Sequence, residues 1–231
     1  MKPKKSKGIL YVVATPIGNL EDMTLRAIRV LKEVDLIASE DTRKLKILLK
    51  RYGIEKPTVS FFEGNEEKRT KELLKLLEEG KHIALLSEAG TPTISDPGYK
   101  LVKTASERNI RIIPIPGPNA AITALSASGL PTDSFYFFGF LPPKGSKRKK
   151  RLEEISYCKG TVIIYESPQR LLETLEELLQ YCGDRRVSLA RELTKLHEEF
   201  IRGELSEVIE KLKQRKIKGE ITIVMEGLGW R

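Results

Sequence analysis

LLSEAGTPTISDPGYKLV, residues 85–102, carries the pattern from which the fold of this chain can be predicted. An apolar run ends at Leu86, two turns of small residues follow, and a helical pattern resumes at Tyr99. A continuous apolar run bounded by turns is typical of a strand buried on both faces of a sheet. Strand, loop and helix in this order form the repeating unit of a parallel α/β sheet.

The same order recurs through the first half of the chain, at a spacing that predicts parallel βαβ units. Asp22 and Asn65 are expected to cap the helices that follow them. We expect strands at 9–14, 35–39, 58–61, 82–86 and 110–115, alternating with helices at about 25–34, 43–51, 66–79 and 99–108.

The regular alternation of strand and helix ends after residues 116–118, and a mixed sheet is predicted for the second half. Strands at 187–192 and 198–201 lie too close together for a helix between them. Ser167 is expected to cap a helix in which Pro168 is the first residue. The other expected elements are a helix at 119–128, an aromatic strand at 135–140, a mobile basic loop at 142–151, a helix around Leu152, a strand at 161–165, a helix at 205–214 and a strand at 221–225. The chain is therefore expected to form two α/β domains, 1–117 with a mainly parallel sheet and 118–231 with a mixed sheet.

The positive charge of the chain is local. The 231 residues are 40% hydrophobic, enough for a sizeable core, and the net charge is +9. Residues 1–7 include four lysines, residues 144–151 include six basic residues, and the remainder has 31 basic and 32 acidic residues. Two concentrated basic stretches indicate interaction surfaces, with a solubilising tail and a solvated loop as the alternative.

Several classes of protein are disfavoured by composition. Two cysteines, and no apolar leader near the first residue, argue against secretion and a disulfide framework. No apolar run approaches the length of a membrane span. Only two histidines are present, and neither cysteine lies at ligand spacing from one, so no metal site is expected. A cytoplasmic protein is predicted.

Two dense polar clusters follow predicted strands and could carry chemistry. Glu40, Asp41 and Arg43 come directly after an apolar strand end and could bind or deprotonate a hydroxyl group. The alternative is that Asp41 or Thr42 caps the next helix. The segment 191–195, which includes Lys195, poses the same choice. No loop matches a Walker motif or G-x-G-x-x-G, so the two commonest phosphate-binding loops are missing.

Six motifs are distributed along the chain: VVATPIGNLEDMTLRA (12–27), SEDTR (39–43), SEAGTPTISDPGYKLV (87–102), PIPGPNAAITALSASGLP (114–131), YESPQRL (165–171) and RELTK (191–195). Taken together, these sequences resemble the tetrapyrrole methylase superfamily and, more narrowly, its branch of small-subunit ribosomal RNA methyltransferases. The resemblance runs from about residue 9 to about residue 226, with one departure: Glu88 stands where the family usually has aspartate.

This resemblance implies a homodimeric enzyme that uses S-adenosylmethionine to methylate the ribose 2′-hydroxyl of a cytidine in 16S ribosomal RNA, free or within the assembled 30S subunit. It implies a cofactor cleft between the two domains, the second of which is also expected to dimerise. Asp41 or Glu40 would orient or deprotonate the hydroxyl, and Arg43 and Lys195 would contact phosphate or the transition state. The implied cofactor-binding residues are Pro16, Glu88, Gly90, Thr91, Gly117, Ile122, Thr123, Tyr165, Glu166 and Ala190. The expected RNA-binding residues are Lys144, Lys147, Arg148, Lys149, Lys150 and Arg151.

Two other functions fit parts of the sequence. A methyltransferase acting on a small tetrapyrrole would share the fold and the cofactor but would not need a long basic segment. A non-catalytic RNA-binding or assembly protein would keep the basic surface but would not need a pocket of small residues.

Overall fold

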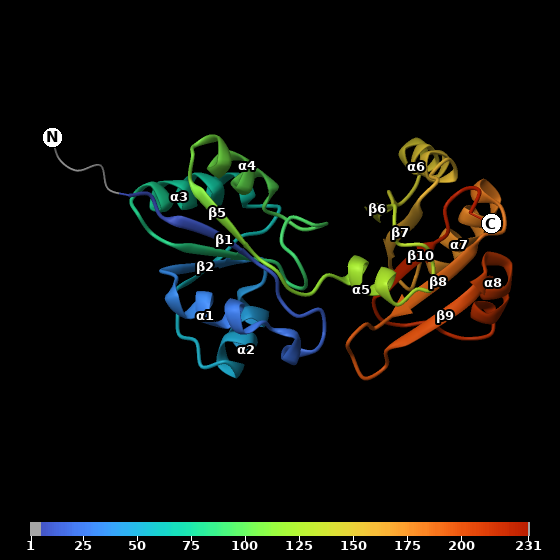
Figure 1. Ribbon diagram of the computed structural model, residues 1–231, viewed down its shortest axis with the longest axis horizontal. Helices are drawn as coiled ribbons and strands as arrows, with labels where there is room; N and C mark the ends of the chain where they lie inside the picture. The colour runs from blue at the N-terminus through green and yellow to red at the C-terminus, as the bar shows by residue number, and fades with distance from the viewer. Residues whose placement is uncertain (1–5, 231) are drawn as a thin grey trace. The chain divides into compact units, whose positions relative to one another are not determined.

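The computed structural model describes residues 6–230, and the chain divides into two compact units, Met1–Asn119 and Ala120–Arg231. Each unit contains a five-stranded sheet with helices on both faces (Figure 1). Residues 1–5, which include most of the first basic stretch, lie outside the described residues. The predicted fold class, two α/β domains with one parallel and one mixed sheet, is confirmed.

In the first unit the five strands are parallel, in the order β3-β2-β4-β1-β5. Their side chains alternate between two apolar layers, so that Val13 and Leu86 face one pair of helices, α1 and α2, while Leu10 and Leu85 face the other pair, α3 and α4 (Figure 1). The elements are β1 (Ile9–Val13), η1 (Leu20–Asp22), α1 (Leu25–Glu33), β2 (Leu36–Ser39), α2 (Thr42–Arg51), β3 (Thr58–Ser60), α3 (Glu66–Glu78), β4 (Ile83–Leu86), α4 (Tyr99–Glu107) and β5 (Arg111–Ile115).

Two of the predicted helix starts need correction. Asp22 belongs to the short helix η1, and Thr24 caps α1 by accepting a hydrogen bond from the amide of Ala27. Asn65 stands at the cap position of α3 but does not cap it with its side chain, which instead accepts from Phe62 N and donates to Ser60 O. Near Asp22 a second capping residue, Thr24, lies two positions later, and at Asn65 the side chain holds the preceding turn instead.

The second unit has the mixed strand order β6-β7-β10-β8-β9. β6 and β7 are parallel, and β10 is antiparallel to both of its neighbours. α6, α7 and α8 cover one face of the sheet with a single apolar core, whereas α5 packs against β7 and β10 (Figure 1). The elements are α5 (Ala120–Ser126), β6 (Phe135–Phe140), α6 (Ser146–Ser156), β7 (Thr161–Glu166), α7 (Leu171–Cys182), β8 (Arg186–Arg191), β9 (Glu199–Glu204), α8 (Leu205–Lys213) and β10 (Ile221–Met225).

The prediction of a mobile basic loop at 142–151 is wrong, because α6 begins within it at Ser146. The glycine and prolines that argued against a helix lie before its first residue, and Leu152 and Ile155 anchor the helix in the core. The predicted start of α7 is also wrong. That helix begins at Leu171, and the amide of Ser167 donates to the carboxylate of Glu166.

Candidate functional site

The carboxyl ends of the parallel strands in the first unit gather four of the predicted loops at one edge of the sheet. Ligands of open α/β sheets bind at this edge, where the helices after neighbouring strands leave on opposite faces. β4 lies between β1 and β2 and is followed by α4 on one face, whereas its neighbours are followed by α1 and α2 on the other. The topology therefore places the candidate site of this unit at the ends of β1, β2 and β4.

The loop after β4 is held in an unusual backbone conformation. Thr93 and Ser95 have φ angles of 74° and 66°, and Gly98 has a φ of 130°. A positive φ is costly for a β-branched residue such as Thr93 and persists only where the surroundings enforce it. One such restraint is the buried carboxylate of Glu66, which accepts the amide of Gly98 at 3.0 Å. The strained segment is thus fixed in place beside the end of β4.

Most of the predicted cofactor residues of the first unit join its loops to one another. Gly90 exchanges two backbone hydrogen bonds with Thr15, at 2.8 and 3.0 Å, and its φ of 86° suits glycine. Thr91 Oγ1 donates to Pro118 O at 3.1 Å. A Cβ on Gly117 would lie 2.9 Å from that of Ala14, so this glycine is needed for packing. Pro16 is buried and directly follows Thr15, which forms the two backbone hydrogen bonds with Gly90. These contacts hold the loops after β1, β4 and β5 together.

Three carboxylates lie within electrostatic reach of one another at this edge. Burial and the charge of Glu88 raise the pKa of Glu40. Burial, then Glu40 and Glu88, raise the pKa of Asp96 from 3.8 to about 6, although a hydrogen bond with Ser87 opposes the shift. Glu88 itself is exposed and forms an ion pair with Lys44. Carboxyl groups with raised pKa values are candidate proton acceptors at neutral pH.

Asp96 was not predicted as a site residue. Its sequence, Asp96-Pro97-Gly98, is that of an ordinary turn, and only the fold brings it beside Glu40, a residue 56 positions earlier in the chain. The available signal was the acid itself, within a loop after a buried strand that otherwise has few charges.

Asp41 and Arg43 have a structural role in the fold. The Asp41 carboxylate accepts the amides of Arg43 and Lys44 at 2.8 and 3.4 Å and so caps α2. It also pairs with the guanidinium of Arg43 at 3.2 Å, which holds the pKa of Asp41 below its ordinary value. The capping alternative thus has direct geometric support, and Glu40 is the member of this cluster with the raised pKa.

In the second unit, the predicted cofactor residues Tyr165 and Ile122 lie near the start of α5. The hydroxyl of Tyr165 accepts the amide of Ala121 at 3.2 Å, and the ring contacts Phe137 and Phe140, with centroids 4.9 and 5.6 Å apart. Ile122 is 49% exposed on α5, and Thr123 follows it. Ala190 is buried in β8 opposite Thr222 of β10.

The Glu166 side chain is fully buried and committed to the protein, which leaves only its main chain for the predicted contact with a cofactor. It accepts from the amide of Ser167, the guanidinium of Arg170 and the hydroxyl of Thr174. The prediction treated Glu166 as a ligand of the cofactor, but a carboxylate with these partners fixes the turn between β7 and α7.

Arg148 is likewise not available to RNA. It is 3% exposed, and its guanidinium donates to Glu177, to Thr174 and to the carbonyl oxygen of Pro142. Arg151 remains exposed, paired with Glu154 at 2.6 Å and placed over the ring of Phe138. The basic residues of the run thus have different roles, since helical periodicity turns Arg148 towards the core.

Lys195 lies in the loop between β8 and β9, which is strained like the loop after β4. Glu192 and Thr194 have φ angles of 50° and 66°. The ammonium of Lys195 bonds Glu192 and Glu220 at 2.9 and 3.0 Å, which raises its pKa. These bonds hold the loop in shape, and Lys195 would have to exchange one of them to contact a phosphate.

Residues 6–230 contain no group of three His, Cys, Asp or Glu side chains placed to hold a metal ion, and none of their helices is long and apolar enough to cross a membrane.

Comparison with known proteins identifies the family. The profile of the tetrapyrrole (corrin/porphyrin) methylases matches residues 9–209. The chain belongs to this family. Among its relatives, the ribosomal RNA small subunit methyltransferase I of Halalkalibacterium halodurans is 54% identical over 98% of this chain and 78% of the relative. The proteins of the same name from Thermotoga maritima and Bacillus subtilis are 50% and 52% identical over 87% and 89% of this chain, and over 90% and 70% of their own lengths. These relatives place this methylase in the branch that the sequence motifs indicated.

Solved structures of tetrapyrrole methylases share the fold. A cobalt precorrin-4 methyltransferase superposes with a TM-score of 0.70 at 15% identity, covering 94% of each chain. The uroporphyrin-III C-methyl transferase of Thermus thermophilus, complexed with S-adenosyl homocysteine, gives 0.66 at 18% identity, covering 95% of this chain and 97% of the other. At such low identity the likeness establishes the architecture and leaves the substrate of this methylase to other arguments.

Proposed function

We propose that this methylase transfers a methyl group from S-adenosylmethionine to the ribose 2′-hydroxyl of a cytidine in 16S ribosomal RNA. The observation that carries the proposal is identity of about half with relatives named ribosomal RNA small subunit methyltransferase I, over nearly the whole chain. The solved uroporphyrin-III and cobalt precorrin-4 methyltransferases share only 15 to 22% of their residues with it.

The loops of the first unit suit such a cofactor. S-adenosylmethionine supplies a methyl group on a cationic sulfur, which activates it for transfer. Glu40, Glu88 and Asp96 bring three carboxylates together, and the cation recorded beside them among residues 6–230 is Lys44, so the cluster favours a positively charged ligand. Gly90 and Thr91 would hold the cofactor in this unit, and Tyr165, Ile122, Thr123 and Ala190 remain predicted contacts of the second.

The reaction requires a group that orients the ribose hydroxyl and takes its proton as the oxygen–carbon bond forms. Glu40 and Asp96 suit this role better than Asp41, because their pKa values are raised and their carboxylates do not cap a helix. A proton accepted at either carboxylate would leave the ribose oxygen as the nucleophile. Positioning is expected to supply most of the rate enhancement, since the methyl group is already activated.

The exposed lysines of the second unit are the proposed RNA contacts. Lys144, Lys147, Lys149 and Lys150 lie on the surface at and before the start of α6. Their charge would neutralise phosphates of ribosomal RNA, free or in an assembled 30S subunit. We further propose a cytoplasmic homodimer with dimerisation through the second unit.

The decisive experiment incubates the protein with labelled S-adenosylmethionine and either naked 16S RNA or 30S subunits, then maps 2′-O-methylation. One labelled cytidine is expected, and a chelator should not abolish binding of the cofactor measured by calorimetry. Label that enters a tetrapyrrole and not RNA would support the small-molecule alternative. RNA binding without any transfer would make the protein a binding factor.

A further inference from the structure

The carboxyl end of β6 and the first turns of α6 form a surface that combines an exposed aromatic ring with exposed cations. We call it the aromatic–basic corner and define it as Phe140, Lys144, Lys147, Lys149 and Lys150. Phe140 is 58% exposed, and all four lysines are exposed. From residue 134 to residue 152 the sequence has no acidic residue. No ion pair of these four lysines is recorded among residues 6–230.

A buried network fixes the backbone of this corner. Arg170 donates to the carbonyl oxygen of Leu141 at 3.2 Å, and Arg148 donates to that of Pro142 at 3.0 Å. Both guanidinium groups are held in turn by carboxylates, Glu166 and Glu177. Two of the three residues between Phe140 and Lys144 are therefore anchored from beneath.

The same network removes competing charge from the surface. The buried carboxylate of Glu166 pairs with Arg170, and the carboxylate of Glu177 pairs with Arg148. These acids therefore neutralise the two arginines. The outward-facing lysines keep their charge for a partner. Phe140 is meanwhile restrained on one side by the ring of Tyr165, 5.6 Å away, and its backbone is fixed by buried Leu141. At Phe140, therefore, little side-chain or backbone entropy remains to be lost when a ligand binds.

We infer that the aromatic–basic corner is a nucleotide-binding surface for single-stranded RNA, on which a base stacks against Phe140 while the lysines contact the flanking phosphates. The inference rests on the proposed RNA substrate and names the residues that would hold it. Single-stranded RNA matches both features, because an unpaired base has an accessible face and the backbone is a dense line of negative charge. In duplex RNA the bases are stacked internally, so it could use the lysines but not the ring.

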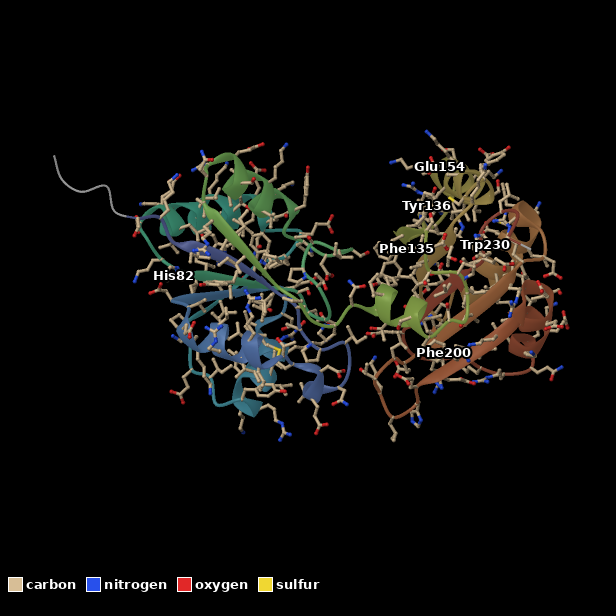
Figure 2. All side chains as sticks on the ribbon, in the orientation of Figure 1. His82, Phe135, Tyr136, Glu154, Phe200 and Trp230 are labelled. Atoms are coloured by element: carbon tan, nitrogen blue, oxygen red, sulfur yellow. The ribbon has the colours of Figure 1, made fainter. Side chains whose placement is uncertain are left out.

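The chain offers a matched control on the same strand. Phe135 is 42% exposed and begins β6, opposite Thr161, whereas Phe140 ends it, opposite Tyr165. Their partners on β7 are four positions apart, so the backbones of Phe135 and Phe140 are separated by about 13 Å along the strand. Phe135, which Figure 2 labels, lies at the end of the strand remote from the Phe140–Lys150 segment. It therefore reports the effect of removing an exposed ring from β6 without touching the corner.

The test is a filter-binding salt series with a single-stranded fragment of 16S RNA and the same sequence in a duplex. Phe140→Ala should weaken single-strand binding roughly five- to 150-fold, the range for one stacked base, without changing the slope of log affinity against log salt. Phe140→Trp should restore the affinity, and Phe135→Ala should leave it unchanged. Replacing the four lysines by serine should flatten the slope by about 0.7 for each lost contact.

Several outcomes would overturn the inference. Equal affinities of the Phe140→Ala and Phe135→Ala proteins would do so, as would equal losses on single strand and duplex. A loss of cofactor affinity in Phe140→Ala would assign the ring to the cofactor through Tyr165. Sedimentation showing that Phe140→Ala dissociates a dimer would make the corner a contact between copies. Binding of the wild type to anionic vesicles that requires Phe140, without RNA binding, would assign it to a lipid surface.

Turnover separates this inference from the proposed function. If the wild type methylates 16S RNA, the inference predicts that Phe140→Ala raises KM for RNA and leaves kcat near normal. If the wild type methylates no RNA, the proposed function fails irrespective of Phe140. If Phe140→Ala methylates RNA with an unchanged KM, the proposed function is supported, and the inferred role of the aromatic–basic corner in RNA binding is contradicted.

Discussion

The two units present opposite charges at corresponding places in their sheets. In the first, Glu40, Glu88 and Asp96 gather where parallel strands β2 and β4 end, and two of these acids have raised pKa values. In the second, lysines are exposed where parallel strands β6 and β7 lead into helices, and the nearby acids Glu166 and Glu177 are engaged by arginines. The first arrangement suits a cation and a proton acceptor, and the second suits a polyanion.

The comparison also separates two uses of charged side chains. In the second unit, buried ion pairs hold loops so that other cations can remain exposed. In the first, backbone strain at Thr93 and Ser95 accompanies two carboxyl groups with raised pKa values, Glu40 and Asp96. Within residues 6–230, four of the five positive-φ residues other than glycine lie in the loops after β4 and β8, which carry two of the family motifs. The following predictions test how far this division holds.

The largest effect is expected from breaking the buried network of the second unit. Arg148→Met removes a guanidinium that is 3% exposed and leaves Glu177 without its closest partner. The free energy of unfolding should fall by about 3 kcal/mol, the low end for a broken buried pair because Glu177 is partly exposed. Urea denaturation measures it. Lys150→Met, on the exposed side of the same helix, should change stability by no more than about 0.5 kcal/mol. Equal effects would show that the network does not anchor α6.

The next effect concerns Asp96, whose pKa is raised from 3.8 to about 6 by burial and by Glu40 and Glu88. The folded state holds this proton more tightly than the unfolded state, so its contribution to stability is greatest below pH 4 and falls as the pH rises to about 6. A shift of this size corresponds to about 3 kcal/mol, which solvent screening of a half-buried group should reduce to about 1–2 kcal/mol.

Asp96→Asn removes this titration. The variant should be more stable than the wild type at pH 7 by about 1–2 kcal/mol, and the difference should vanish near pH 4. Urea denaturation at several pH values measures both. A difference that does not depend on pH would mean that Asp96 keeps an ordinary pKa. If Asp96 is also the proton acceptor, the same substitution should lower kcat while leaving cofactor affinity near normal.

A smaller effect on stability distinguishes Asp41 from its neighbour Glu40. Asp41→Ala should cost about 1 kcal/mol through the lost cap of α2, whereas Asp41→Asn should cost only a few tenths because asparagine also caps well. Asp41→Asn should keep turnover within a few-fold of the wild type, and Glu40→Gln should lower it at least tenfold. The opposite ranking would return the catalytic role to Asp41.

The sequence supported the fold more reliably than the charged site residues. Strand and helix order follow from apolar runs and periodicity, which are local, and most boundaries lay within one or two residues. The orientation of charged side chains was harder to predict, because nothing in the basic run distinguishes the buried Arg148 from its exposed neighbours. Asp96 acquires its raised pKa from Glu40 across 56 positions, which no short motif reveals. Glu166 was placed in a motif that does resemble the family, but its buried partners could be seen only in the fold.

The smallest effect is expected from Glu88→Asp, which substitutes the residue usual in the family. Glu88 pairs with Lys44 at the exposed edge of the first sheet, where an ion pair contributes about 0–1 kcal/mol. One methylene less should weaken this pair but keep the negative charge, so stability should change by at most about 0.5 kcal/mol and cofactor affinity by only a few-fold.

Glu88→Gln removes the charge and should therefore lower the raised pKa of Asp96, because Glu88 is one of its causes. The pH dependence of unfolding would show the shift, and calorimetry would give the affinity of both variants. If Glu88→Asp changed the titration of Asp96 as much as Glu88→Gln, the length of this side chain rather than its charge would govern the acidic edge, and the contrast between the two units would not be one of charge alone.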